Sequence, residues 1–190
     1  QGNRNCNDGI AFAQTIEGAM DEMTNMLQRI RTLSIQAANG TYSQEDRKSI
    51  QQELTQLSTE ITRIACKTTY AGKTVLNGYS ASFADKTIIG PDGQVTFQVG
   101  ANANDTIAVT NMSEGFMLCV IATKAGLNPN QFGQNNSPIQ KDGNLIRFSV
   151  STQSMAQLTL GAIDGMIQVI DSKRAELGAV QNRMESTIRN

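Results

Sequence analysis

Apolar residues recur at helical spacing over three long stretches of the chain. From about residue 5 to residue 38 they return every three or four positions for about nine turns, which predicts one long amphipathic helix. Its apolar face consists of Ile10, Phe12, Ile16, Ala19 or Met20, Met23, Met26 or Leu27, Ile30, Leu33 and Ala37. The third such stretch begins near residue 152 and continues to residue 190, so a second helix of similar length is predicted there.

A shorter helix is predicted between these two. Asn39–Gly40 is a typical helix stop, and Ser43 followed three residues later by Asp46 is a weaker form of the capping box that starts a helix. The new helix should run to about residue 65, with a narrow seam formed by Ile50, Leu54, Leu57, Ile61 and Ile64. Because only a short turn separates it from the first helix, we expect the two to lie antiparallel.

The centre of the chain loses helical spacing and becomes rich in Gly, Asn, Asp and Thr. Residues 87–90 and 94–99 flank Pro91–Asp92–Gly93 and predict a β-hairpin, with a third strand over 106–110. Lys141–Asp142–Gly143 predicts a turn before another strand over 145–150. Between them we expect a short helix over 116–125 and a polar loop over 128–138.

The predicted fold class is therefore mainly α with a β-rich insertion. It is an elongated, rod-like antiparallel helical bundle of two long helices and one shorter helix, plus β-hairpins, because helices of some 35 residues are about 50 Å long. We expect three regions along the chain: an N-terminal helical pair over 1–66, a hairpin-rich centre over 67–150, and a C-terminal helix over 151–190 that packs on the first two.

Composition excludes several classes of function. The formal net charge of the 190 residues is −1, with both signs interspersed, which argues against binding to nucleic acid. No apolar run approaches the roughly 20 residues that span a bilayer, so no membrane insertion is expected. No basic and apolar leader is present, and the helical pattern is already under way at Gln1 and unfinished at Asn190, so we expect a piece of a longer protein.

Catalytic chemistry and metal binding also find little support. The chain has no His, which removes the commonest general base, the nucleophile pairs that depend on it and the usual zinc sites. Cys6, Cys66 and Cys119 match no metal-binding spacing, so we expect free thiols, although one pair could still form a disulfide. Asp92–Gly93 and Asp142–Gly143 are read as hairpin turns rather than calcium loops. We therefore expect no enzymatic activity, no cofactor and no metal.

Several segments closely resemble bacterial flagellins. They are MLQRIRTLSIQAANG over 26–40 within the matching stretch 7–47, TTYAGKTVLNG over 68–78, FQVGANANDTI over 97–107, and ELGAVQNRMESTIRN over 176–190. The matches lie in the order and spacing of the family and cover both helical ends. Cysteines at positions 6 and 66 depart from the family's pattern, in which cysteine is scarce.

The resemblance implies a structural subunit of the flagellar filament that self-assembles for motility. It further implies export without a cleaved signal peptide, an extracellular location in the bacterial flagellum, and contacts with other flagellin subunits, an export chaperone and the filament cap. The segments that line the filament's inner tube would lie outside this chain, so we expect this piece alone not to polymerise.

A second implication of the resemblance concerns the Toll-like receptor by which hosts sense flagellin. The receptor and filament contact surface would comprise Gln28, Arg29, Leu33, Gln36 and Glu53. Arginine suits a forked, charge-assisted contact, and we expect an exposed Leu33 to add apolar area at its centre. Thr32 stands where the family has a glutamate. The alternative is that these polar residues only solvate the helix or serve filament contacts.

Two other classes of protein remain open. A hook–filament junction (hook-associated) protein would share the helical ends and the export route, and a secreted coiled-coil adhesin would share only the helical pattern. The segments over 26–40 and 176–190 favour flagellin over both.

Overall fold

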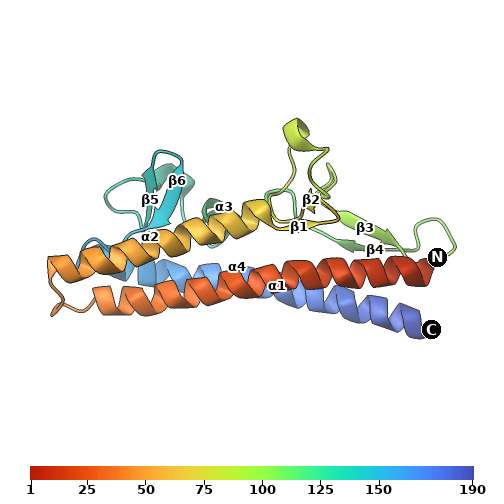
Figure 1. The fold of residues 1–190 in the computed structure, drawn as a ribbon, viewed down its shortest axis with the longest axis horizontal. Coiled ribbons are helices and arrows are strands. Elements are labelled where there is room, and N and C mark those ends of the chain that lie inside the picture. Colours follow the sequence, from red (N-terminus) through yellow and green to blue (C-terminus); the bar gives the residue numbers. More distant parts are fainter. The chain divides into compact units, whose positions relative to one another are not determined.

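The structure is a computed structural model that describes all residues from Gln1 to Asn190. Its four α-helices are α1 (Gly2–Ala37), α2 (Gln44–Lys67), α3 (Leu118–Lys124) and α4 (Gln153–Arg189), as Figure 1 shows. The six short strands are β1 (Thr69–Tyr70), β2 (Lys73–Thr74), β3 (Val95–Gln98), β4 (Thr106–Val109), β5 (Ile139–Asp142) and β6 (Leu145–Phe148). Two 3₁₀ turns, η1 (Ala81–Phe83) and η2 (Pro129–Gln131), complete the set. The predicted class, mainly α with β-hairpins, is confirmed.

The chain divides into two compact units. The first unit contains Gln1–Asp21, Ala65–Phe116 and Ser172–Asn190, and the second contains Glu22–Ile64 and Met117–Asp171. Each unit therefore combines a part of α1 and a part of α4 with segments from the centre of the chain.

The first unit packs an aromatic cluster between α1 and its two hairpins. Phe12 is fully buried, and its ring centroid lies 5.6 Å from those of both Tyr70 and Phe97. The Tyr70 ring meets Phe12 edge-on, and its hydroxyl donates to the backbone oxygen of Asp8 at 3.1 Å. These contacts hold the β1–β2 and β3–β4 hairpins against the same helix.

An ion pair between a buried lysine and a partly exposed glutamate joins α4 to the end of β4 in the same unit. Lys173, only 5% exposed, lies 3.0 Å from a carboxylate oxygen of Glu176 and donates to the backbone oxygen of Thr110. The other carboxylate oxygen of Glu176 accepts from the backbone nitrogen and the hydroxyl of Thr110. The buried ammonium of Lys173 is thus paired, as burial of a charge requires.

Two loops of this unit approach too closely for any residue but glycine. A Cβ on Gly115 would lie 2.7 Å from the backbone nitrogen of Gly78, and both residues have positive φ angles, +73° and +77°. Backbone hydrogen bonds from Tyr79 to Ser113 and from Phe116 to Leu76 join the same two loops.

The hairpin predicted over 87–90 and 94–99 is wrong. Residues 91–93 do form a turn, closed by the Gly93 to Gly90 backbone hydrogen bond, but β3 pairs with β4 instead. Val95 lies opposite Val109 and Phe97 opposite Ile107, so the apolar residues of β3 find apolar partners across the strand. Residues 87–90 contact β2 instead, through a parallel bridge between Thr87 and Thr74.

The second unit holds α2 against the C-terminal half of α1. The helices are antiparallel, because Arg47 of α2 contacts Ala37 of α1 while Glu53 contacts Arg29. Its β5–β6 hairpin turns at Gly143, which has φ +62°, so the predicted turn is confirmed. The strand predicted over 145–150 corresponds to β6, which ends at Phe148. The predicted short helix is α3, and the predicted loop over 128–138 contains η2.

The structure forms no disulfide between any of the three cysteines. Cys6 is buried, and this burial raises the pKa of its thiol above the ordinary value. No group of three or more His, Cys, Asp or Glu side chains is arranged to hold a metal ion. Nor does any helix combine the length and the apolar character needed to cross a membrane.

Candidate functional site

Four of the five predicted contact residues lie exposed on α1 and α2 within the second unit. We call Gln28, Arg29, Gln36 and Glu53 the α1–α2 polar surface. At 100° per residue Arg29 and Gln36 lie within about 20° of each other around the α1 axis, so they share a flank of that helix. Glu53 reaches the same flank from α2 through its ion pair with Arg29.

Arg29 and Glu53 form a two-pronged ion pair. The Nε of Arg29 donates to Oε1 of Glu53 at 2.9 Å, and its NH2 donates to Oε2 at 3.3 Å. The hydrogen bond and the charge of Glu53 raise the pKa of the Arg29 guanidinium above its ordinary value. Both side chains remain almost half exposed, at 49% and 45%, so a partner could contact the pair from solvent. Such a partner meets a forked, locally neutral group rather than a lone charge.

The two arginines of the sequence Arg29–Ile30–Arg31 contact different helices. Positions two apart on a helix differ by about 200°, so Arg31 lies on the opposite flank of α1. There its Nε donates to Asp164 of α4 at 2.9 Å. Each arginine thus extends from α1 to one neighbouring helix, and only Arg29 belongs to the α1–α2 polar surface.

The expectation that Leu33 is exposed is wrong. Its side chain is only 2% exposed, because it lies three residues beyond Ile30 on the face that packs into the bundle. The apolar spacing of α1 predicts a buried Leu33. The expectation of an exposed leucine came from the resemblance alone. Leu33 supports the α1–α2 polar surface from beneath and offers no apolar contact area of its own.

The turn beside this surface is fixed by polar contacts. Ser43 and Asp46 form the predicted capping box: the backbone nitrogen of Ser43 donates to Asp46 Oδ2 at 2.9 Å, and that of Asp46 donates to Ser43 Oγ at 3.1 Å. Asp46 Oδ2 also accepts from the hydroxyl of Ser43 at 2.8 Å, and the two hydrogen bonds that it accepts from Ser43 lower the pKa of the Asp46 carboxyl. Arg47, 9% exposed, donates to the backbone oxygens of Ala37 at 2.9 Å and Asn39 at 3.2 Å, and so caps the end of α1. The register between α1 and α2, and with it the Arg29–Glu53 pair, depends on this turn.

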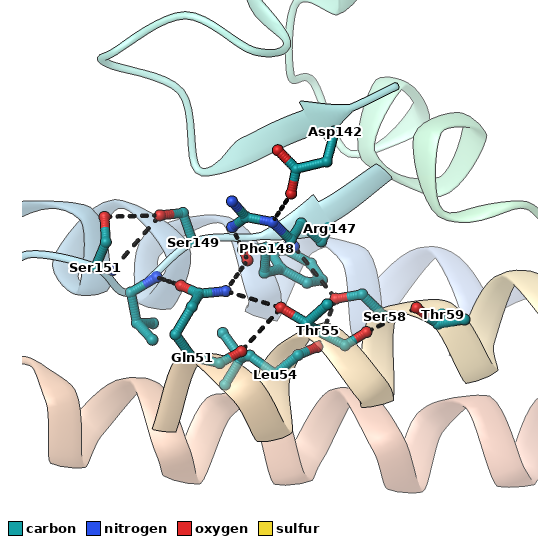
Figure 2. A network of polar contacts seen from close by, with 11 residues as sticks. Gln51, Leu54, Thr55, Ser58, Thr59, Asp142, Arg147, Phe148, Ser149 and Ser151 are labelled. Atoms are coloured by element: carbon teal, nitrogen blue, oxygen red, sulfur yellow. Dashed lines mark hydrogen bonds and ion pairs between the residues drawn. The ribbon is translucent and has the colours of Figure 1, made fainter. Parts of the chain in front are cut away.

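A polar network on the other side of α2 was missed by sequence reasoning (Figure 2). The amide of Gln51 donates to the backbone oxygen of Phe148 at 3.0 Å and accepts from the backbone nitrogen of Val150 at 2.7 Å. Two turns further, the buried hydroxyl of Ser58 accepts from the backbone nitrogen of Phe148 at 3.2 Å. Gln51 thereby pairs with the β6 segment as a neighbouring strand would. The only signal in the sequence was the set of polar residues flanking the narrow apolar seam of α2.

The arrangement offers a forked ion pair and amide side chains as contact groups. The α1–α2 polar surface has one charged pair, in which each group neutralises the other, and amide side chains around it. It contains no nucleophile placed beside a base, which covalent catalysis requires. Its position on two helices held in fixed register suits recognition by another protein.

A family model described as the bacterial flagellin N-terminal helical region matches residues 1–81. Flagellin FlaB1 of Treponema pallidum (strain Nichols) is 35% identical over 188 residues, which cover 99% of this chain and 59% of that protein. Flagellin C of Vibrio cholerae is 32% identical over 98% of this chain and 68% of its own length. The flagellar filament 31.3 kDa core protein of Treponema maltophilum is 32% identical over 100% of this chain and 59% of its own length. The chain thus spans between 59% and 68% of these three relatives.

Solved structures share the fold. The crystal structure of Bacillus cereus flagellin matches with a TM-score of 0.73 at 24% identity, over 99% of this chain and 88% of that one. FliC from Burkholderia pseudomallei matches with a TM-score of 0.67 at 22% identity, over 92% of this chain and 99% of that one. At such identities these two matches concern the fold alone.

Proposed function

Because this chain belongs to the bacterial flagellin family, we propose that it forms the core of a flagellar filament subunit and assembles with other copies of itself for motility. The observation that carries this proposal is the 32% identity to a Vibrio cholerae flagellin over 98% of the chain and 68% of the relative. Long helices at both ends of the chain and small hairpins between them are consistent with it.

Deleting the gene in the source bacterium tests this proposal by electron microscopy. We expect cells that lack the protein to lose the filament shaft and the ability to swim, while the basal structures and hook remain. Complementation with the intact gene should restore both. Cells that keep full-length shafts but detach them at the hook would contradict the proposal and indicate the junction protein instead.

The same proposal places the assembled protein outside the cell, as part of the bacterial flagellum. It includes export without removal of a signal peptide, and transient contacts with an export chaperone and the filament cap. Intact-mass measurement of subunits released from purified filaments tests the export route. The mass should equal that of the translated chain, apart from loss of the initiator Met, and loss of an N-terminal leader would contradict it.

We further propose that the α1–α2 polar surface contacts neighbouring subunits and the host Toll-like receptor for flagellin. Support comes from the exposure of Gln28, Arg29, Gln36 and Glu53 and from the forked Arg29–Glu53 pair. Leu33 has a supporting part in this proposal, since its burial holds the α1 backbone beneath Arg29 and Gln36.

Receptor activation by monomeric subunit variants tests that surface. We expect Arg29→Ala and Glu53→Ala each to lower potency at least about tenfold, the loss that about 1.4 kcal/mol of binding energy produces. Gln52→Ala is the matched control, because Gln52 is an exposed neighbour of Glu53, and it should leave potency unchanged. Leu33→Met keeps the buried volume and should also be neutral. Unchanged potency in both Arg29→Ala and Glu53→Ala would refute the receptor role.

A further inference from the structure

The chain contains two Asn-Gly dipeptides, Asn39–Gly40 and Asn77–Gly78. In such a dipeptide the backbone nitrogen of the glycine can attack the side-chain amide carbon of the asparagine, because no glycine side chain blocks the approach. On sequence alone the two sites are equivalent. In the structure they differ, since Asn39 and Gly40 are both exposed in the turn between α1 and α2, whereas Gly78 is buried within the first unit.

The backbone nitrogen of Gly40 is free to act as a nucleophile. It donates no hydrogen bond, and the nearest atoms to a Cβ on Gly40 would be those of the Gln153 amide, at 3.6 Å and beyond. The backbone oxygen of Asn39 belongs to the same peptide unit, and it accepts from Arg47 and from the backbone nitrogen of Tyr42, each at 3.2 Å. When the peptide N–H loses its proton, the negative charge is shared with that oxygen, so both donors stabilise the attacking anion.

The side-chain amide of Asn39 is prepared as the electrophile. Its Oδ1 accepts from the backbone nitrogen of Thr41 at 3.1 Å and from the Thr41 hydroxyl at 2.9 Å. The first of these hydrogen bonds closes a ring of atoms that includes the Gly40 nitrogen, so the side chain folds back over its attacker. Both donors also stabilise the negative charge that develops on Oδ1 when the nitrogen adds to the amide carbon. The turn therefore polarises both reacting groups.

The second dipeptide is held away from this reaction. Gly78 has a φ of +77°, and a Cβ on Gly115 would lie 2.7 Å from the Gly78 nitrogen, so a neighbouring backbone encloses that nitrogen. The hydroxyl of Thr87 donates to the backbone oxygen of Gly78 at 3.0 Å and fixes the loop further. Ring closure at Asn77 would have to disrupt this packing, because the reacting atoms must first reach an attack geometry.

We propose that Asn39 deamidates spontaneously in the folded chain and that Asn77 is protected. The Gly40 nitrogen forms a bond to Cγ of Asn39, the Cγ–Nδ2 bond breaks, and ammonia leaves with the proton that the Gly40 nitrogen gives up. Water then opens the cyclic imide at either carbonyl, which leaves aspartate or isoaspartate at position 39. Nothing is oxidised or reduced. The reaction needs neither a second copy nor a receptor, so it stands independently of the proposed function.

The modification would alter the turn that sets the register of α1 and α2. Either product adds a negative charge near the C-terminal end of α1, where the helix dipole disfavours it. Isoaspartate also adds a carbon to the main chain, which displaces the backbone oxygen of residue 39 from its donors Arg47 and Tyr42. We expect modified subunits to unfold at a lower temperature than unmodified ones.

Time-resolved peptide mapping of the monomeric full-length subunit at mildly alkaline pH tests the proposal. Mass spectrometry locates the exchange of an amide NH2 for OH, and enzymatic methylation identifies isoaspartate. In the folded subunit Asn39 should convert at least about tenfold faster than Asn77, because packing keeps Asn77 from the attack geometry. In urea the two sites should convert at similar rates, and Asn39 should convert no faster there than in the folded subunit.

Two substitutions in the turn test the separate parts of this mechanism. Gly40→Ala should slow conversion of Asn39 about tenfold or more, because the added methyl group blocks the nitrogen. The variant should fold, since Gly40 has no positive φ and the space beside Gln153 admits a Cβ. Thr41→Val removes only the hydroxyl donor to Oδ1 and should slow conversion about threefold. Thr32→Val is the matched control, because the Thr32 hydroxyl donates only within α1, and it should leave the rate unchanged.

Equal rates at Asn39 and Asn77 in the folded subunit would overturn the proposal. Faster conversion of Asn39 in urea than in the folded subunit would also overturn it, because the turn would then protect the amide. A wild-type rate in Thr41→Val would refute the polarising part of the hydroxyl. The comparison of the two dipeptides takes place within one wild-type molecule, so it decides the proposal even if a variant fails to fold.

Discussion

Leu33 and Ile35 are two residues apart on α1, yet one is 2% and the other 47% exposed. The helical spacing predicts this contrast, because Leu33 falls with Ile30 on the packed face and Ile35 falls outside it. Resemblance to a family transfers the identity of a residue but not its environment. For Leu33 the apolar pattern was the better guide, and the expected exposed anchor was wrong.

Alanine substitutions at Leu33 and at Ile35 test how differently the two side chains contribute to stability. Leu33→Ala should lower the free energy of unfolding by about 2–5 kcal/mol, because it leaves a cavity in the bundle. Ile35→Ala should change it by less than about 1 kcal/mol, since little area there is removed from water. Urea unfolding followed by circular dichroism provides both values, and equal losses would contradict the burial described here.

Gln51 is the residue-level feature that sequence patterns could not reveal. A glutamine at the edge of an apolar seam normally faces water. The hydrogen bonds of the Gln51 amide with Phe148 and Val150 form only because the β5–β6 hairpin packs against α2 at this position. Such placement is set by tertiary contacts nearly 100 residues apart, which no local spacing encodes.

We expect Gln51→Ala to lower the free energy of unfolding by about 1–3 kcal/mol, because backbone groups of Phe148 and Val150 lose their partner. Gln52→Ala, on the exposed side of the same helix turn, serves as the control and should cost less than about 0.5 kcal/mol. Chemical denaturation of the two variants in parallel is the measurement. Indistinguishable midpoints would show that the Gln51 amide adds nothing to stability.

At the scale of elements, the helices were predictable and the strand pairing was only partly so. Each long helix shows many turns of the same period, and the capping box at Ser43 marks the start of α2. In a strand of four residues, the alternation of apolar and polar positions is too short to predict which strand it pairs with. The turn at residues 91–93 led to the prediction that β3 pairs with the segment before that turn. In the structure β3 pairs with β4, where Val95 and Phe97 lie opposite apolar residues.

The capping box predicts a pH dependence of stability. The hydrogen bonds from Ser43 lower the pKa of Asp46 in the folded state below its ordinary value of 3.8. A lowered folded-state pKa contributes stability that is present above the unfolded pKa and is lost as the pH falls through the folded pKa. Wild type should therefore exceed Asp46→Ala in stability at pH 7, and the difference should shrink below about pH 4. Thermal unfolding at pH 7, 4 and 3 tests this, and a difference that grows on acidification would contradict it.

At the scale of the whole molecule, the chain belongs to the bacterial flagellin family. The α1–α2 polar surface is built on helices whose opposite faces form the packed interior. Resemblance in the sequence indicated the family and the polar surface before the structure. A groove lined by Leu158 of α4 could not be predicted, because α4 and the segment from α3 to β5 join to form it only in the folded chain.

Cryo-electron microscopy of native filaments, combined with mass spectrometry of their subunits, tests the central claim most directly. The account predicts that the subunit repeated along the whole shaft contains this chain, with α1, α2 and α4 recognisable in the density of every copy. Detection of this chain only at the base of the filament, with a different protein repeated along the shaft, would contradict it.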